Sequence, residues 1–156
     1  MNFITGGLYI LKDQYYHDYP DKYLKQNKQE HRPFYFCFED DKTGLYWMIP
    51  LSSSPNKIAL ARLKEQQGKT DIFHFTRIDG KDGVMLIADM CPVSAEYISD
   101  EYQISNTHVV FKDRKELKEI RSKASKVLRL LRKGIKFSPT QPDIFAIEKD
   151  LISKCK

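Results

Sequence analysis

The N-terminal part of the chain combines short stretches of alternating hydrophobic and polar residues with continuous apolar runs, which together predict a series of β-strands. GLYIL at 7–11 predicts a first strand, followed by a short helix and a polar, basic loop. Two aromatic runs joined by EDDKTG predict a β-hairpin within 33–51, and IDGKDG supplies the turn of a second hairpin within 71–90. The last strand of that hairpin is nearly all apolar and should be central, while Pro92 ends regular pairing or marks an edge strand.

Three later segments carry the signals of longer helices. SPNKIALARLKEQQG begins with serine and proline and ends with glycine, which predicts a helix near 55–67. From Asp113 to Gly134 the apolar period changes to three and four, and a last helix opens after Thr140 or Pro142. The apolar stripes of the last two helices consist of Leu117, Ile120, Ala124, Val127, Leu128 and Leu131, and of Ile144, Ile147, Leu151 and Ile152.

Length and composition extend this pattern to a fold class. With 156 residues and a hydrophobic fraction of 41%, we expect one domain over 1–156 of the α+β class, a twisted antiparallel sheet with helices around it. No apolar run approaches the ~18 residues that cross a bilayer, and the N-terminus lacks the features of a signal peptide, so we expect a cytoplasmic protein without a membrane partner. Cys37, Cys91 and Cys155 are far apart, which fits reduced thiols.

The positive charge is concentrated in one segment. The chain has a net charge of +5, but residues 112–136 hold eleven Lys or Arg and three Asp or Glu, so this segment carries +8 and the remainder −3. A focused basic face indicates a polyanionic partner, most often nucleic acid, although a merely solvated helix face is the alternative. The cations expected on the solvent side of this helix are Lys118, Arg121, Lys126, Arg129, Arg132 and Lys133.

Several catalytic motifs are missing from the sequence. It has no GxGxxG or GxxxxGK[ST] phosphate loop, no HExxH and no paired CxxC. No group of Asp, Glu, His or Cys shows convincing ligand spacing. We therefore expect neither a cofactor nor a metal.

The stretch MIPLSSSPNK at 48–57 interrupts an apolar run with three serines. Pro50 should limit the strand, and Ser54 before Pro55 is a good helix N-cap. One serine suffices for a cap, which leaves Ser52 and Ser53 at a corner where hydroxyls and backbone N–H groups favour an anion. Lys57 in the first helical turn opposes the helix dipole, which indicates a role other than stabilising the helix. An ordinary polar corner explains these residues equally well from composition alone.

Several stretches taken in order resemble one family. NFIT near the start, YWMIPLSSSPNK, GVMLIADMCPVSAEYI and the basic helix resemble the toxins of type III toxin–antitoxin systems, the ToxN/AbiQ, TenpN and CptN group. PLSSSPNK is similar to the family pattern Pro-Leu-Ser/Thr-Ser-Pro-Lys, and FSPTQPDI suggests the TenpN or CptN branch. The extra serine and Asn56 leave open which serine takes the active position.

The resemblance implies a phage-defence endoribonuclease on a MazF-like, SH3-like barrel. Such an enzyme cuts cellular or phage mRNA without metal, leaving a 2′,3′-cyclic phosphate. It is inhibited by a repeated pseudoknot RNA antitoxin that it processes, and a closed protein–RNA heteromer is expected. A non-catalytic RNA-binding module is the alternative, and a protein-binding adaptor that uses the aromatic sheet is a third class.

Site residues follow from this chemistry. Ser52, Ser53 and Lys57 are expected to stabilise charge on the phosphate, with Arg32 as a bidentate clamp and His31 as a candidate for proton transfer. The predicted RNA-binding set is completed by the basic helix and by Tyr9, Lys28 and His74. A core tyrosine is the alternative for Tyr9, and a surface histidine is the alternative for His31. His74 should face away from whatever Phe73 and Phe75 bury, so it is either a functional histidine or simply an exposed one.

Overall fold

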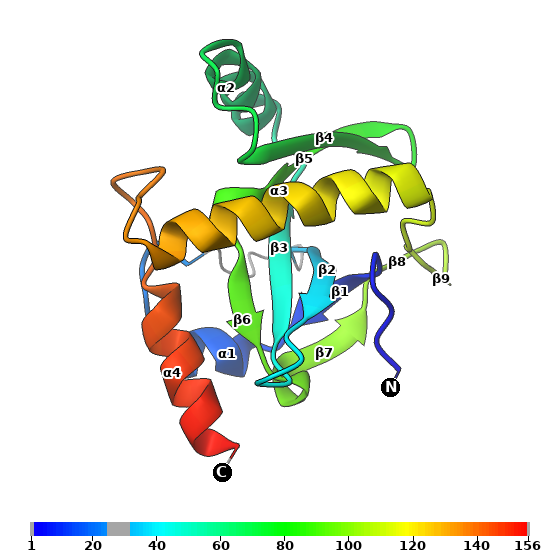
Figure 1. The fold of residues 1–156 in the computed structure, drawn as a ribbon. Helices are drawn as coiled ribbons and strands as arrows, with labels where there is room; N and C mark the ends of the chain where they lie inside the picture. The colour runs from blue at the N-terminus through cyan, green and yellow to red at the C-terminus, as the bar shows by residue number, and fades with distance from the viewer. Residues whose placement is uncertain (1, 25–31, 156) are drawn as a thin grey trace.

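A curved antiparallel sheet with helices around it forms the body of the protein (Figure 1). The computed structural model describes residues 2–24 and 32–155. Within these residues the larger sheet has the strand order β4-β5-β3-β2-β1-β7, with β6 paired to β3, and β8 and β9 form a separate hairpin. The strands are β1 Leu8–Leu11, β2 Phe34–Glu39, β3 Tyr46–Ser52, β4 Phe73–Ile78, β5 Lys81–Leu86, β6 Cys91–Val93, β7 Ile98–Glu101, β8 Gln103–Ile104 and β9 Thr107–His108. The α-helices are α1 Asp13–Asp18, α2 Pro55–Gln66, α3 Arg114–Arg132 and α4 Ile144–Lys154.

Both predicted hairpins and every predicted helix are present, and the α+β class is confirmed. β4 and β7, the two ends of the strand path, do not pair with each other in the described part of the chain. The sheet is therefore not closed by hydrogen bonds, and the SH3-like barrel is not confirmed. Along residues 2–24 and 32–155, no helix combines the length and the apolar character needed to span a bilayer.

Strand β3 links the two halves of the sheet and does not stop at Pro50. On one edge it pairs with β2, and on the other edge it pairs first with β6 and then with β5. Pro50 lies between these last two partners, after the Met48–Cys91 pair and before the Leu51–Met85 pair. Proline has no N–H to donate, so it is tolerated at this position, where neither β6 nor β5 pairs with β3. The prediction that the strand ends at Pro50 is therefore wrong. The strand instead runs on to Ser52.

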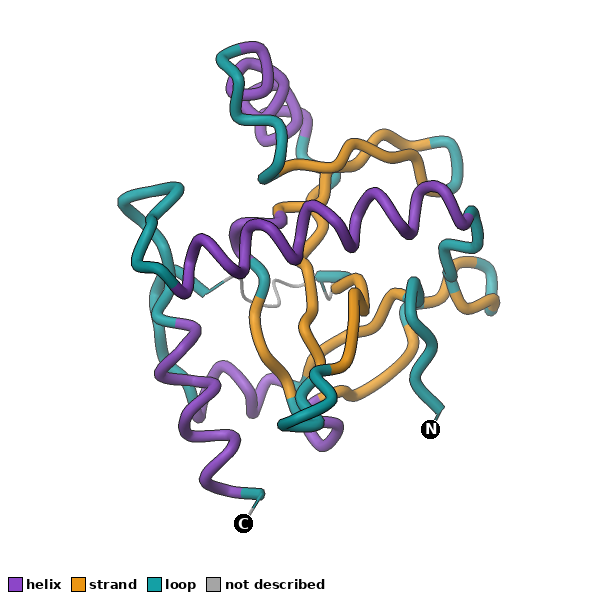
Figure 2. The backbone as a smooth tube through the Cα atoms, viewed as in Figure 1, coloured by secondary structure: helices purple, strands orange, loops and turns teal. Residues whose placement is uncertain are grey.

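Helix α3 crosses the strands (Figure 2), and its apolar side chains form part of the core. Asp113 caps its start by accepting a hydrogen bond from the Lys115 N–H, and Gly134, at φ 87°, follows its end. The predicted stripe is confirmed, with Leu117 half-buried and the other members buried. Helix α4 buries Ile144, Ile147 and Leu151 in the same way. Both helices thus pack their apolar stripes into the core next to the sheet.

The three cysteines differ in their surroundings, and two of them are core thiols. Cys37 and Cys91 are buried, and burial raises the pKa of each thiol to about 12. Cys155 is exposed at the end of α4. Since the thiolate is the reacting form, a raised pKa lowers reactivity near neutral pH.

We therefore expect iodoacetamide at pH 8 to label Cys155 alone in the folded protein and all three cysteines after unfolding in urea. Intact mass spectrometry after a short incubation distinguishes one adduct from three. Rapid labelling of Cys37 or Cys91 without denaturant would contradict the buried position of these thiols.

Candidate functional site

The corner between β3 and α2 gives its three serines different roles. Ser54 caps α2, with its Oγ accepting from the Lys57 N–H at 3.5 Å, as predicted. Ser52 is buried, and its Oγ accepts from the Ser54 N–H at 3.3 Å. Ser53 is exposed, and its hydroxyl has no hydrogen-bond partner within residues 2–24 and 32–155. Ser53 is therefore the serine with a hydroxyl available to a ligand.

A cleft of about 530 Å³ opens beside this corner. Arg32 and the serines lie on its lining together with the turn between β4 and β5 and the segment around β8. The register that pairs Ser52 with Val84 brings these segments together, since it sets the start of β5 beside the end of β3. The lining residues are Arg32, Pro33, Leu51, Ser52, Ser53, Ser54, Ile78, Asp79, Lys81, Asp82, Gly83, Tyr102 and Ile104.

Arg32 is held by the backbone of the corner. Its Nη1 donates to the Leu51 carbonyl at 2.9 Å, which ties the guanidinium to the strand that carries the serines. Burial lowers the pKa of Arg32, and the charges of Tyr16 and Asp89 act in the opposite direction. A guanidinium partly withdrawn from water interacts more strongly with an incoming anion than one on an open surface. The cleft therefore brings together Arg32, Ser52 and Ser53, three of the predicted catalytic residues.

The start of helix α2 adds positive potential at the rim of the cleft. Pro55, its first residue, directly follows the cleft-lining Ser54. The N-terminus of a helix carries partial positive charge and favours anions. Lys57 lies in this first turn and is exposed, but it does not line the cleft. The corner is thus suited to an anion, with Lys57 at its edge and not inside.

Two predicted RNA-binding residues lie in the core instead. Tyr9 is fully buried, its Oη accepts from the Ile4 N–H at 2.7 Å, and its ring packs against that of His108 at 5.0 Å. The RNA-binding role predicted for Tyr9 is wrong, and the core alternative is confirmed. Nothing in the local sequence distinguishes an RNA-binding tyrosine from a core tyrosine, because an aromatic residue in a strand suits either face of a sheet.

His74 does face away from Phe73 and Phe75, but it is buried and not exposed. Its Nε2 lies 2.9 Å from Glu116 Oε2 of α3. On the other face of β4, Arg62 of α2 stacks on the ring of Phe75 at 3.7 Å. Because helices cover both faces of β4, the prediction that His74 binds RNA is wrong. His31 and Lys28 lie outside the described residues.

Several cations of the basic helix α3 already have partners within the fold and are less available to RNA than the charge of the helix suggests. Lys126 Nζ lies 2.6 Å from Asp71 Oδ2, and Arg132 donates two hydrogen bonds to the Glu148 carboxylate at 2.9 and 2.8 Å. Arg121 lies over the ring of Phe38 at 5.4 Å. Lys118, Arg129 and Lys133 are exposed and have no partner in the part of the chain that the structure describes.

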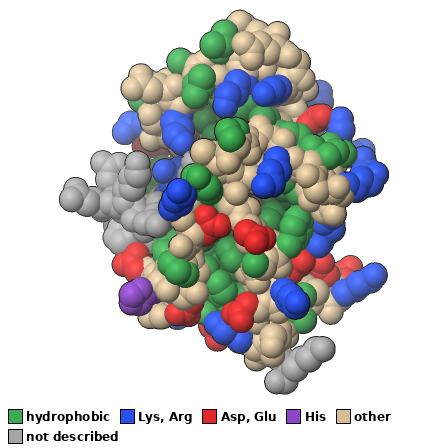
Figure 3. All heavy atoms as spheres, turned by 90° about the vertical axis from the view of Figure 1, so that its left-hand side faces the viewer, with side chains coloured by type: hydrophobic (Ala, Val, Ile, Leu, Met, Phe, Trp, Pro, Cys, Tyr) green, Lys and Arg blue, Asp and Glu red, His purple; other side chains and the backbone are tan. Residues whose placement is uncertain are grey.

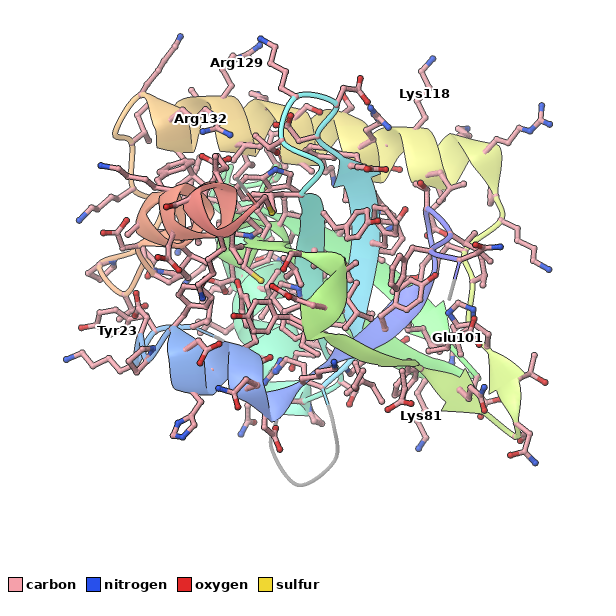
Figure 4. All side chains as sticks on the ribbon, turned by 90° about the horizontal axis from the view of Figure 1, so that it is seen from below. Tyr23, Lys81, Glu101, Lys118, Arg129 and Arg132 are labelled. Atoms are coloured by element: carbon pink, nitrogen blue, oxygen red, sulfur yellow. The ribbon has the colours of Figure 1, made fainter. Side chains whose placement is uncertain are left out.

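Two of these free cations, Lys118 and Arg129, lie on the opposite side of the protein from Lys81 of the cleft. Figure 4 shows Lys118 and Arg129 projecting from α3 in one direction, while the cleft residue Lys81 projects in the other. On the face that carries α4, acidic and basic side chains are interspersed (Figure 3). The structure therefore offers two separate places for a polyanion, the cleft side and the outer side of α3.

Four residues of the cleft with polar or charged side chains were not among the predicted site residues, namely Asp79, Lys81, Asp82 and Tyr102. Asp79 lies in the turn predicted from IDGKDG, and Lys81 and Asp82 directly follow that turn, so the exposure of these three side chains was predictable. Their closeness to Ser53 was not, because it depends on the pairing of β3 with β5. No local signal marks Tyr102 as a cleft residue.

Comparison with known proteins gives a likeness in fold. No protein-family model and no curated protein matches the chain. A solved structure from work on a processed non-coding RNA that regulates a bacterial antiviral system superposes with a TM-score of 0.64 and 14% identity, covering 93% of this chain and 96% of that one. AbiQ, a lactococcal anti-phage endoribonuclease belonging to the type III toxin–antitoxin system, superposes with a TM-score of 0.70 and 14% identity, covering 96% and 97%. The chain thus has the fold of these proteins along nearly its whole length.

Proposed function

We propose that the protein is an endoribonuclease toxin of a type III toxin–antitoxin system, acting in defence against phage by cutting single-stranded cellular or phage mRNA. The observation that carries the proposal is the unengaged hydroxyl of Ser53 beside Arg32 in one cleft, at the positive end of α2. The fold shared with AbiQ, itself an anti-phage endoribonuclease, supports it.

The proposed reaction is a transesterification within the RNA backbone. The 2′-oxygen forms a bond to the adjacent phosphorus, the bond from phosphorus to the 5′-oxygen breaks, and the proton lost by the 2′-OH is balanced by one gained at the 5′-oxygen. The products are a 2′,3′-cyclic phosphate and a 5′-hydroxyl. Ser53, Arg32 and the N-terminus of α2 stabilise the extra negative charge on the crowded phosphorane. Lys57 adds positive charge from the rim, and His31, next to Arg32 in sequence, is the proposed proton-transfer residue.

Metal independence is part of the proposal. Protein donors can supply the charge stabilisation that a divalent ion provides in other nucleases. In residues 2–24 and 32–155, no three His, Cys, Asp or Glu side chains are grouped so that they could hold a metal ion.

The proposed inhibitor is a repeated pseudoknot RNA that the toxin processes. The outer side of α3 and the cleft side point in opposite directions, so one protein molecule can contact two RNA segments at once. A head-to-tail contact of this kind, repeated around an axis, gives a closed protein–RNA heteromer. Membership of the TenpN or CptN branch and kinship with MazF-like barrels belong to the same proposal and rest on the sequence resemblance.

The test is incubation of the purified protein with single-stranded RNA in EDTA, with an all-deoxy oligonucleotide of the same sequence as control. Cleavage of the RNA alone, with cyclic-phosphate ends identified by mass spectrometry, is the expected result. Bound but intact RNA would favour the non-catalytic binding module, and absence of RNA binding would favour the protein-binding adaptor. Activity that EDTA removes and Mg²⁺ restores would contradict the metal-independent mechanism.

A further inference from the structure

The cleft contains a carboxylate that a phosphate site does not need. The turn between β4 and β5 places Asp79, Lys81 and Asp82 on the lining. Asp82 is paired, with its Oδ1 3.2 Å from Arg77 Nε. Asp79 is exposed and has neither an ion-pair nor a hydrogen-bond partner in the described parts of the chain. Because a carboxylate repels phosphate, Asp79 must face a different part of any RNA in the cleft.

The turn itself does not explain the charge of Asp79. Asp79 and Gly80 have φ angles of 53° and 76°, and Ile78 pairs with Lys81, as in a two-residue turn of type I′. Asparagine and glycine suit the first position of such a turn as well as aspartate does. The backbone therefore requires one of these three residues but not a negative charge.

Apolar and aromatic groups lie in the cleft with Asp79. Tyr102 and Ile104 are on the lining, as is Ile78 next to the turn. The main chain of Tyr102 is fixed, since its N–H donates to the Leu8 carbonyl at 2.9 Å and its carbonyl accepts from the Val109 N–H at 3.0 Å. Tyr102 lies between β7 and β8, and an aromatic ring on a backbone held in this way is a stacking surface for an unpaired nucleobase. A hydrogen-bond acceptor in the same cleft then faces the edge of that base.

We infer that Asp79 is a specificity-determining residue that accepts a hydrogen bond from the exocyclic amino group of a base flanking the cleaved phosphate, while Tyr102 stacks on the ring. The inference rests on the proposed function. Adenine, cytosine and guanine carry an amino group that donates to a carboxylate. Uracil carries none. Its pairing edge offers a single N3–H donor between two carbonyl oxygens, and these oxygens repel a carboxylate that approaches the edge. The cleft thus selects against uracil at one position.

The experiment uses DNA oligonucleotides that contain a single ribonucleotide, so that only one bond has a neighbouring 2′-OH. The bases on both sides of that bond are varied through all combinations, and initial cleavage rates are measured. At one of the two positions the wild-type protein is expected to prefer amino-bearing bases over uracil by about tenfold, the discrimination typical of one good contact. In Asp79→Asn the amide N–H₂ donates to a uracil carbonyl, and the preference is expected to fall close to one. Asp79→Gly keeps the turn and is expected to lose the preference as well.

Asp82→Asn is the matched control, because it removes a carboxylate of the same turn that Arg77 already engages. It is expected to keep the base preference, and thermal unfolding shows whether each variant folds. An unchanged base profile in Asp79→Asn would overturn the inference. So would loss of all cleavage with an unchanged binding profile, which would instead assign Asp79 to proton transfer.

A binding experiment with the same oligonucleotides separates this inference from the proposed function. Fluorescence anisotropy measures the affinity of the Ser53→Ala variant and of the Ser53→Ala variant that also carries Asp79→Asn. A base preference in binding that Asp79→Asn removes, without cleavage by the wild-type protein, supports base recognition and contradicts the nuclease. Cleavage by the wild-type protein with no preference against uracil contradicts the base recognition alone. Absence of both binding and cleavage contradicts both.

Discussion

Replacing Ser53 by alanine is expected to reduce RNA cleavage by about 10²- to 10³-fold, the loss seen when one donor to a developing oxyanion is removed. The Ser53 hydroxyl lines the cleft and makes no hydrogen bond to any described residue, so the substitution removes a possible ligand contact and no internal one. The unfolding temperature should not change, because the side chain is exposed. Single-turnover cleavage of a labelled oligoribonucleotide and a thermal melt measure the two effects.

Ser54→Ala is the control from the same corner. The Ser54 side chain caps α2, so its loss is expected to lower the free energy of unfolding by about 1 kcal/mol, the typical value of a cap. Cleavage should decrease far less than in Ser53→Ala. If Ser54→Ala abolishes cleavage while Ser53→Ala retains it, the active serine has been assigned to the wrong position.

The elements of this fold were predictable because their signals are local. Each hairpin has its two strands adjacent in sequence, α2, α3 and α4 begin at capping residues, and α3 and α4 carry apolar stripes. The path of β3 through Pro50 was not predictable in the same way. Whether a proline interrupts a strand depends on which edge has a partner at that residue, and here β6 and β5 leave a gap beside it. That gap is a property of the sheet and not of the segment.

The candidate site was predicted in part for the same reason. The serine corner is a local motif, so the cap at Ser54 and the availability of Ser53 follow from neighbouring residues. The error at His74 arose because period-two alternation shows that two faces differ, but not that α2 covers one and α3 the other. Asp79 was not predicted as a site residue because aspartate is common in tight turns and the turn alone explains its presence. Only the structure shows that this turn lines the same cleft as the serine corner.

Residues outside the basic helix α3 decide which of its cations are available to RNA. Its sequence gives no reason to separate Lys126 and Arg132 from the other cations. In the structure both have carboxylate partners, Asp71 and Glu148, from segments outside the helix. Cations that already hold a carboxylate within the fold gain less from a phosphate than cations surrounded by water. Arg121 is engaged too, since it lies over the ring of Phe38. The RNA-binding prediction for α3 therefore narrows to Lys118, Arg129 and Lys133.

Changing Lys118, Arg129 and Lys133 together to glutamine is expected to weaken binding of the antitoxin RNA and to flatten its salt dependence. Each phosphate contact contributes roughly 0.7 to the slope of log affinity against log salt in a single strand and roughly 0.9 in a duplex, so the loss of three contacts should reduce the slope by about 2 to 3. Stability should change little, since none of the three side chains has a partner among the described residues and the apolar stripe of α3 is untouched. Filter binding across a series of NaCl concentrations gives the slope.

Two comparisons make the result specific to the outer side of α3. Lys126→Gln removes a cation of the same helix that Asp71 already engages, so it should change the slope by less than any one of the three free cations. Cleavage of a short oligoribonucleotide by the triple variant should remain at the wild-type rate, because such a substrate fills the cleft and does not extend to the opposite side, where Lys118 and Arg129 project. An unchanged slope and affinity in the triple variant would show that α3 is only a solvated helix face. Equal losses of antitoxin binding and of short-substrate cleavage would show that the two sides do not act as separate RNA sites.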